Sequence, residues 1–220
     1  MRHASSIHEG LARSNSALID TIITTEKWDC GGLVVKLSDC DADHFRIFHS
    51  FVYHPHIYSR QANDISDETP GGDKEWSRLA KTYVLDAHLQ APHFMDAVTD
   101  AIIEKALDYS PLSNDTAQTS MHEITYPHTS PKAGIQHLLV DIAATRWNLR
   151  TFHTHKPSPS SAEFFFELSA ALYKLKTGSL AKVPLARVEE TGITCAYHGN
   201  KTTNLFSPTV HVCYKDKFKA

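Results

Sequence analysis

The sequence predicts a predominantly α-helical α+β domain with few strands, because its apolar residues mostly recur at three- and four-residue spacing. Residues 76–107 and 133–176 show this helical period most clearly. Only the run LVVKL at 33–37 and two short runs near the carboxyl terminus have a β-like pattern. With 220 residues, 41% of them hydrophobic, the chain is long enough for one substantial core.

The amino-terminal part predicts helices separated by clear breaks. Residues 7–23 fit two short helices with a break at 14–16, and Gly31-Gly32 precedes the predicted strand at 33–37. Serine and aspartate residues then cap a helix with an apolar face. Its expected buried residues are Phe45, Phe48, Phe51 and Val52.

The central and carboxyl-terminal parts predict four more helices. Two of them meet at an angle at Pro92, because proline is tolerated in the first turn of a helix. Two others cover 133–147 and 161–176, and polar loops are expected at 61–75 and 108–133. In the tail, GITCAYH and TVHVCYK are β-like, but the connection between them leaves their register undetermined.

Composition gives no indication of a nucleic-acid or membrane partner. The formal net charge is -3, and no apolar run reaches the roughly 18 residues of a membrane span. The first ten residues do not resemble a signal peptide, and the four cysteines form no CxxC pair. We therefore expect reduced thiols and an intracellular location, cytoplasmic or nuclear.

The stretch VLDAHLQAPHFMDAV at 84–98 concentrates Asp86, His88, His93 and Asp96 and so raises the question of a metal site. Asp86 and His88 lie about 200° apart around a helix axis, so they cannot face one ion together. His93 and Asp96 share a face at the solvent-prone start of the next helix. The interpretation favoured is a pair of packed helices whose polar residues are solvated, with no metal.

Catalytic and cofactor motifs are not found, and the sequence predicts a protein that is not an enzyme and carries no cofactor. It contains no nucleophile elbow, no phosphate-binding glycine loop and no dinucleotide fingerprint. Two alternatives stay open: a hydrolase on an unrecognised scaffold, and a small metal-binding protein. The second would use Cys195, His198, His211 and Cys213, although their spacing matches no zinc finger.

In order and spacing, several segments resemble the BTB/POZ domain, in particular the large class from filamentous fungi. IHEGLARSNSALID resembles the first helical segment of that fold, with His8, Leu11 and Ser14 or Ser16 at matching positions. Residues 24–60 resemble the Trp-containing turn, strand and helix that follow, and residues 78–103 resemble the closing helical hairpin. ITYPHTSPKAGIQHLLVDIAATRW resembles the segment after the domain, and the match spans about residues 7–198. The core positions implied for the hairpin are Leu79, Tyr83, Val84, Ala87, Leu89, Phe94, Ala97 and Ile102.

The resemblance implies a truncated BTB/POZ-like helical cluster at 7–107, a linker loop at 108–131, a helical extension at 132–176 and a tail at 177–220 with possible short strands. The family's amino-terminal β-hairpin is missing, so the strand at 33–37 would lack its usual partner. A truncated gene product without independent function is therefore a further alternative.

BTB/POZ domains are non-catalytic interaction modules that self-associate and often bridge a cullin ubiquitin ligase to a substrate. We therefore expect a protein partner, either a second copy or a cullin. At the turn where adaptors carry a hydrophobic-x-Glu signature, this chain has Trp28-Asp29-Cys30, so the glutamate is not in place. The expected partner-binding residues are Trp28, Phe51, Tyr53 and Tyr58, because large aromatic side chains dominate interface energetics. For Phe51, packing in the core is the favoured interpretation.

Overall fold

The computed structural model describes residues 4–25, 34–37, 40–60, 74–108, 121–147, 152, 161–178, 194 and 197–198. These residues are mainly helical, as predicted, and contain no strand; positions 34–37 of the predicted strand have no regular secondary structure. None of the described helices is long and apolar enough to cross a bilayer. The helices are α1 (Glu9–Asn15), α2 (Ala17–Thr25), α3 (Ala42–Tyr53), α4 (Lys74–Leu89), α5 (Pro92–Asp108), α6 (Met121–Thr125), the 3₁₀ helix η2 (Tyr126–His128), α7 (Gly134–Arg146) and α9 (Ala162–Lys176).

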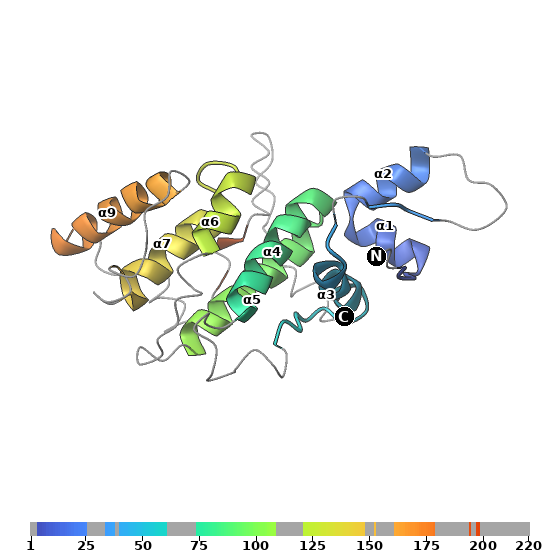
Figure 1. Ribbon diagram of the computed structural model, residues 1–220, viewed down its shortest axis with the longest axis horizontal. Helices are drawn as coiled ribbons and strands as arrows, with labels where there is room; N and C mark the ends of the chain where they lie inside the picture. The colour runs from blue at the N-terminus through green and yellow to red at the C-terminus, as the bar shows by residue number, and fades with distance from the viewer. Residues whose placement is uncertain are drawn as a thin grey trace, which may run out of the picture.

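The molecule is elongated and built around the hairpin of α4 and α5 (Figure 1). Helices α1, α2 and α3 lie to one side of this hairpin, and α6, α7 and α9 lie to the other (Figure 1). Helix α4 contacts α6 and α5 contacts α7. The predicted BTB/POZ-like part and the predicted extension therefore pack directly against each other.

The two predicted helix breaks at 14–16 and Pro92 are confirmed. Hydrogen bonds join the residues at one break to the residues at the other. Ser16 Oγ accepts the Ile19 N–H at 3.1 Å, which caps α2, and donates to the Leu89 carbonyl at 2.6 Å. The Ala17 N–H reaches the Gln90 carbonyl at 3.2 Å. Gln90 has a φ of 52°, a left-handed conformation that turns the chain from α4 into α5.

The core beside α3 is aromatic. Phe48 and Phe51 of α3 are buried, and their ring centroids lie 5.2 Å and 5.1 Å from that of Phe94 on α5. Of the core positions expected in the hairpin, Ala87 is exposed and Val84 is only half-buried. The other expected positions are buried: Leu79, Tyr83, Leu89, Phe94, Ala97 and Ile102.

Helix α6 and η2 correct the prediction of a polar loop over 108–133 at residues 121–128; residues 109–120 of that loop lie outside the described residues. Met121 is fully buried and His122 is 2% exposed, and the His122 ring stacks on Phe164 of α9 at 4.2 Å. Helix α6 has only five residues, so it shows almost no helical period in the sequence. Packing against α4 and α9 stabilises such a short helix, since isolated helices of this length do not persist in water.

Candidate functional site

The structure separates the four expected partner-binding residues. Trp28 lies outside the described residues. Phe51 is 2% exposed and contributes to the core, whereas Tyr53 is 43% exposed and Tyr58 is 61% exposed. Of the expected set, Tyr53 and Tyr58 therefore offer aromatic surface to a partner. We call the surface formed by Tyr53, His56 and Tyr58 the tyrosine surface.

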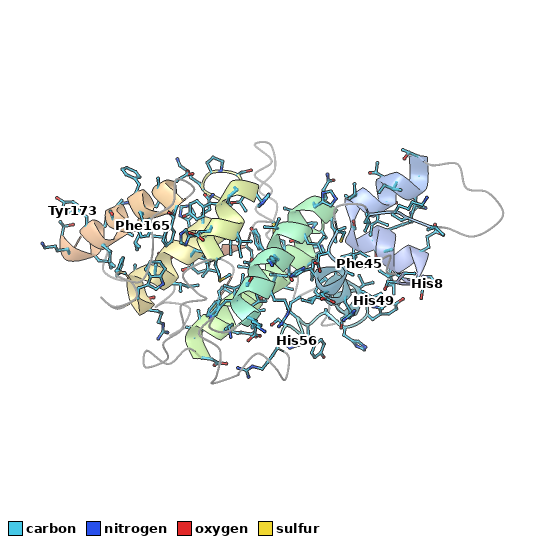
Figure 2. The ribbon with its side chains drawn as sticks, in the orientation of Figure 1. His8, Phe45, His49, His56, Phe165 and Tyr173 are labelled. Atoms are coloured by element: carbon cyan, nitrogen blue, oxygen red, sulfur yellow. The ribbon has the colours of Figure 1, made fainter. Side chains whose placement is uncertain are left out.

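Tyr53 is held in place although its ring is exposed. Its hydroxyl oxygen accepts the backbone N–H of His8 at 3.0 Å, and the His49 ring packs beside it with centroids 5.4 Å apart. His49 Nε2 is itself 2.9 Å from the Ser6 carbonyl oxygen, so the segment before α1 is tied to the outer face of α3 (Figure 2). A restrained aromatic side chain loses less conformational entropy on binding than a free one.

Tyr58 projects from a firmly anchored segment. Ile57 and Ser59 on either side of it are buried, so the extended chain alternates between inward and outward side chains. Ser59 Oγ donates to Glu75 Oε1 at 2.6 Å, which fixes the segment to the first turn of α4. The His56 ring meets the Tyr58 ring edge-on at 4.8 Å, and both residues are exposed; Figure 2 marks His56.

Two of the hollows among the described residues are each too small for an ordinary substrate. Their volumes are about 240 Å³ and 190 Å³ with their open mouths included, below the roughly 300–1,000 Å³ of a typical small-molecule site. The larger is lined by Pro55, His56, Ile57, Ala97, Asp100, Ala101 and Glu104, and the smaller by His122, Leu139, Ile142, Trp147 and Phe164.

The acids of the stretch 84–98 are buried, which corrects the prediction that they are solvated. Asp86 and Asp96 are each 1% exposed. Neither carboxyl oxygen of Asp86 has a hydrogen bond of normal geometry. Burial, and then the nearby Asp96, raises the pKa of Asp86 well above its usual value, and the backbone N–H of Ala91 offsets only part of this rise. Asp86 lies three residues after the buried Tyr83, and this helical spacing could have placed it on the inner face.

The segment that contains Tyr197 and His198 docks against α5 and α7 through buried polar contacts. His198 Nε2 is 2.9 Å from Asp100 Oδ1, and His198 Nδ1 is 3.9 Å from Asp96 Oδ2. The Tyr197 hydroxyl donates to Asp141 Oδ2 at 2.6 Å. A Cβ atom at Gly134 would lie 2.1 Å from the Tyr197 carbonyl oxygen, so only glycine fits at the start of α7.

The predicted metal-binding alternative receives no support from the residues that the structure describes. Within them, no group of three or more histidine, cysteine or acidic side chains could hold a metal ion. His198 contacts Asp100. Cys195, His211 and Cys213, the other three expected ligands, lie outside the described residues.

Sequence reasoning missed a second exposed apolar region, on α9. Six large hydrophobic residues of the described chain are exposed, and three of them, Phe166, Leu172 and Tyr173, belong to this helix. The available signal was that α9 carries more apolar residues than one buried face can use.

Comparisons with known proteins neither support nor replace the family resemblance: no protein-family profile, no curated protein sequence and no solved structure matches this chain.

Proposed function

We propose that this chain is a non-catalytic protein-interaction module of the BTB/POZ type, which binds a protein partner through the tyrosine surface. The observation that carries the proposal is Tyr58, which is 61% exposed although Ile57 and Ser59 beside it are buried and anchored. A chain that fixes a large aromatic side chain in solvent has an anchor ready for a partner's pocket.

The charges beneath the tyrosine surface keep its backbone rigid. Glu75 receives the Ser59 hydroxyl on one oxygen and Lys105 Nζ at 2.7 Å on the other. Arg78 donates to the Ser59 carbonyl oxygen. Two contacts from α4 therefore hold the segment that presents Tyr58, and Lys105 of α5 holds Glu75 in place. Little conformational entropy remains to be lost when a partner binds.

The partner that the BTB/POZ resemblance suggests is a cullin scaffold. In that family the contact typically involves the helix that corresponds to 43–53 and the helices of the hairpin. Tyr53 ends the first of these, and the segment with Tyr58 rests on the second.

A titration with a purified amino-terminal cullin fragment tests the proposal. We expect saturable binding to the fluorescently labelled chain, and we expect Tyr58→Ser to weaken it by about tenfold, as removal of an interface anchor does. Leu172→Ser is the control, because it removes another exposed apolar side chain, on α9 at the other side of the α4–α5 hairpin. No binding, or equal binding by the wild type and Tyr58→Ser, would contradict the proposal.

A further inference from the structure

The inner face of α9 is fixed against the rest of the molecule. Phe164 and Leu168 are each 1% exposed, and Phe164 stacks on His122 with the ring planes 12° apart. The Tyr126 hydroxyl donates to Glu167 Oε2 at 2.7 Å. These contacts define the rotation of α9 about its own axis, and with it the direction in which the opposite face points.

The opposite face of α9 carries an apolar stripe that the described residues leave uncovered. Phe166 is 76% exposed and Tyr173 is 69% exposed. They are seven residues apart, which places them within about 20° of each other around the helix axis, and Tyr173 lies at the outer end of the molecule (Figure 2). We call Ala162, Phe166, Ser169 and Tyr173 the outer stripe; all four are exposed.

The charges beside the outer stripe make α9 electrostatically complementary to an antiparallel second copy of α9. Glu163 and Lys174 are both exposed and lie eleven residues apart, which places them about 20° apart on the same flank of the stripe. Glu163 belongs to the first turn of α9 and Lys174 to the last. In two antiparallel helices related by a two-fold axis, equal flanks face each other, so Glu163 of one copy meets Lys174 of the other.

One register satisfies both the apolar and the charged contacts. The midpoint between Phe166 and Tyr173 falls between Ser169 and Ala170, and the midpoint between Glu163 and Lys174 lies one residue away. Small side chains at the midpoint let the two helices approach closely, since the distance between packed helices depends on the side chains at the contact. A parallel arrangement would instead place the two copies of Glu163 on opposite edges of the interface and far along the axis from either Lys174, so neither ion pair could form.

We propose that the outer stripe is a homodimer interface, in which α9 pairs antiparallel with α9 of a second copy of this chain. The inference deepens the proposed interaction function by naming a second copy as a partner, and it uses a surface separate from Tyr58. Phe166 of each copy packs near Tyr173 of the other, and two symmetric Glu163–Lys174 ion pairs close one edge of the interface.

Sedimentation velocity over a concentration series tests the pairing by charge reversal. We expect the wild-type chain to form a concentration-dependent dimer, and Glu163→Lys and Lys174→Glu each to weaken it about tenfold, because each places like charges in contact. An equimolar mixture of the two variants should recover wild-type affinity, because both ion pairs can re-form between unlike chains. Lys176→Glu is the control: it changes an exposed lysine on the other flank and should alter the affinity less than about twofold.

Disulfide trapping tests the orientation. Ser169→Cys lies at the midpoint and should give an oxidised covalent dimer in high yield. Lys176→Cys should not, because in the antiparallel register the two copies of residue 176 are about 20 Å apart along the axis. Cross-linking mapped by peptide mass spectrometry to both positions would indicate a parallel pair and overturn the proposal.

A monomer at every concentration would also overturn it, as would a dimer indifferent to the charge reversals and to Phe166→Ser with Tyr173→Ser. Those two changes remove no buried side chain, so circular dichroism should show an unchanged fold. Tyr58→Ser should leave the dimer intact. Cullin binding by a chain that does not dimerise would therefore overturn the dimer alone. A dimer that binds no cullin would overturn the proposed cullin interaction alone.

Discussion

The two ends of α4 bury carboxyl groups in opposite ways. Glu75 in the first turn is 7% exposed and has cationic and hydroxyl partners: Lys105 Nζ at 2.7 Å, Ser59 Oγ at 2.6 Å and, more loosely, Arg60 at 3.9 Å. Asp86 in the last turn is 1% exposed, lies near a second acid, and has neither oxygen in a normal hydrogen bond. One helix thus buries a compensated charge at its start and a carboxyl group that favours its neutral form at its end.

This difference separates two roles for buried acids. The Glu75 pair fastens the segment that presents Tyr58, and Lys105 also lies over the Trp76 ring at 5.1 Å. Among the residues that the structure describes, Asp86 has no comparable partner, so its burial opposes folding whenever the group is ionised. Four predictions test the comparison, from the largest expected effect to the smallest.

Removal of the cation beside Glu75 should have the largest effect. Lys105→Met keeps an apolar side chain over Trp76 but leaves a buried carboxylate without its closest cation. We expect the free energy of unfolding to fall by about 3 kcal/mol, as for other broken buried ion pairs. Urea denaturation at neutral pH measures it. Lys81→Met, which changes an exposed lysine of α4, the helix that carries Glu75, is the control, and equal losses in both variants would contradict the proposed role of the pair.

A third buried acid, Asp141, lies between these extremes because it has one strong donor. Burial raises its pKa, and the Tyr197 hydroxyl at 2.6 Å lowers it only in part. Tyr197→Phe should reduce the free energy of unfolding by about 2 kcal/mol, because it leaves a buried carboxylate without that donor. The loss should be greater near neutral pH, where Asp141 is more often ionised, than near about pH 4. Tyr173→Phe removes an exposed hydroxyl and should change almost nothing; a loss independent of pH would contradict the assignment.

Asp86→Asn should stabilise the protein. The folded state raises the pKa of Asp86, so it binds this proton more tightly than the unfolded chain does. The contribution of Asp86 to stability is therefore most favourable below its ordinary pKa and declines as the pH rises toward its folded-state pKa. An asparagine does not ionise, and we expect it to add about 1.5 kcal/mol near neutral pH and progressively less toward acid. Thermal unfolding from about pH 4 to about pH 8 measures this; equal stability of both proteins throughout would contradict it.

Sequence patterns predicted the helices wherever several turns kept one apolar face, and they failed where tertiary contacts decide. The breaks at Ser16 and Pro92 carry local capping signals and were predictable. Burial of Asp96 was not, because a polar residue on a helix predicts solvent unless its packing partners are known. For Asp86 the available signal was its three-residue spacing from Tyr83. Helix α6 was missed because a five-residue helix depends on His122 and Phe164, which are distant in the sequence. The tyrosine surface was half predictable: aromatic residues at 51–58 were recognised, but only the structure separates buried Phe51 from exposed Tyr58.

The smallest effect is expected at an exposed acid that serves as a helix cap. Asp41 Oδ1 accepts the backbone N–H groups of Asp43 at 2.9 Å and His44 at 3.4 Å, at the start of α3. Slight burial acts to raise its pKa, but these two N–H groups and the His44 ring, whose Nδ1 lies 3.0 Å from Asp41 Oδ1, together outweigh it, and the net pKa is lowered. The contribution of Asp41 to stability is thus present at neutral pH and lost as the carboxylate is protonated in acid.

Asp41→Ala should therefore lower the free energy of unfolding by about 1 kcal/mol at neutral pH, the usual loss for a removed amino-terminal cap. The wild type and the variant should converge toward about pH 2. Asp43→Ala in the same turn is the control: within the described part of the chain its carboxylate makes an exposed contact with Arg46 at 3.4 Å, so its loss should be smaller. If both variants lost equal stability, general attraction of acids to the start of α3 would explain the effect, and Asp41 would not act as a cap. Unlike Glu75 and Asp86, an exposed acid stabilises its helix without any compensating group in the core, because water still solvates the remainder of its charge.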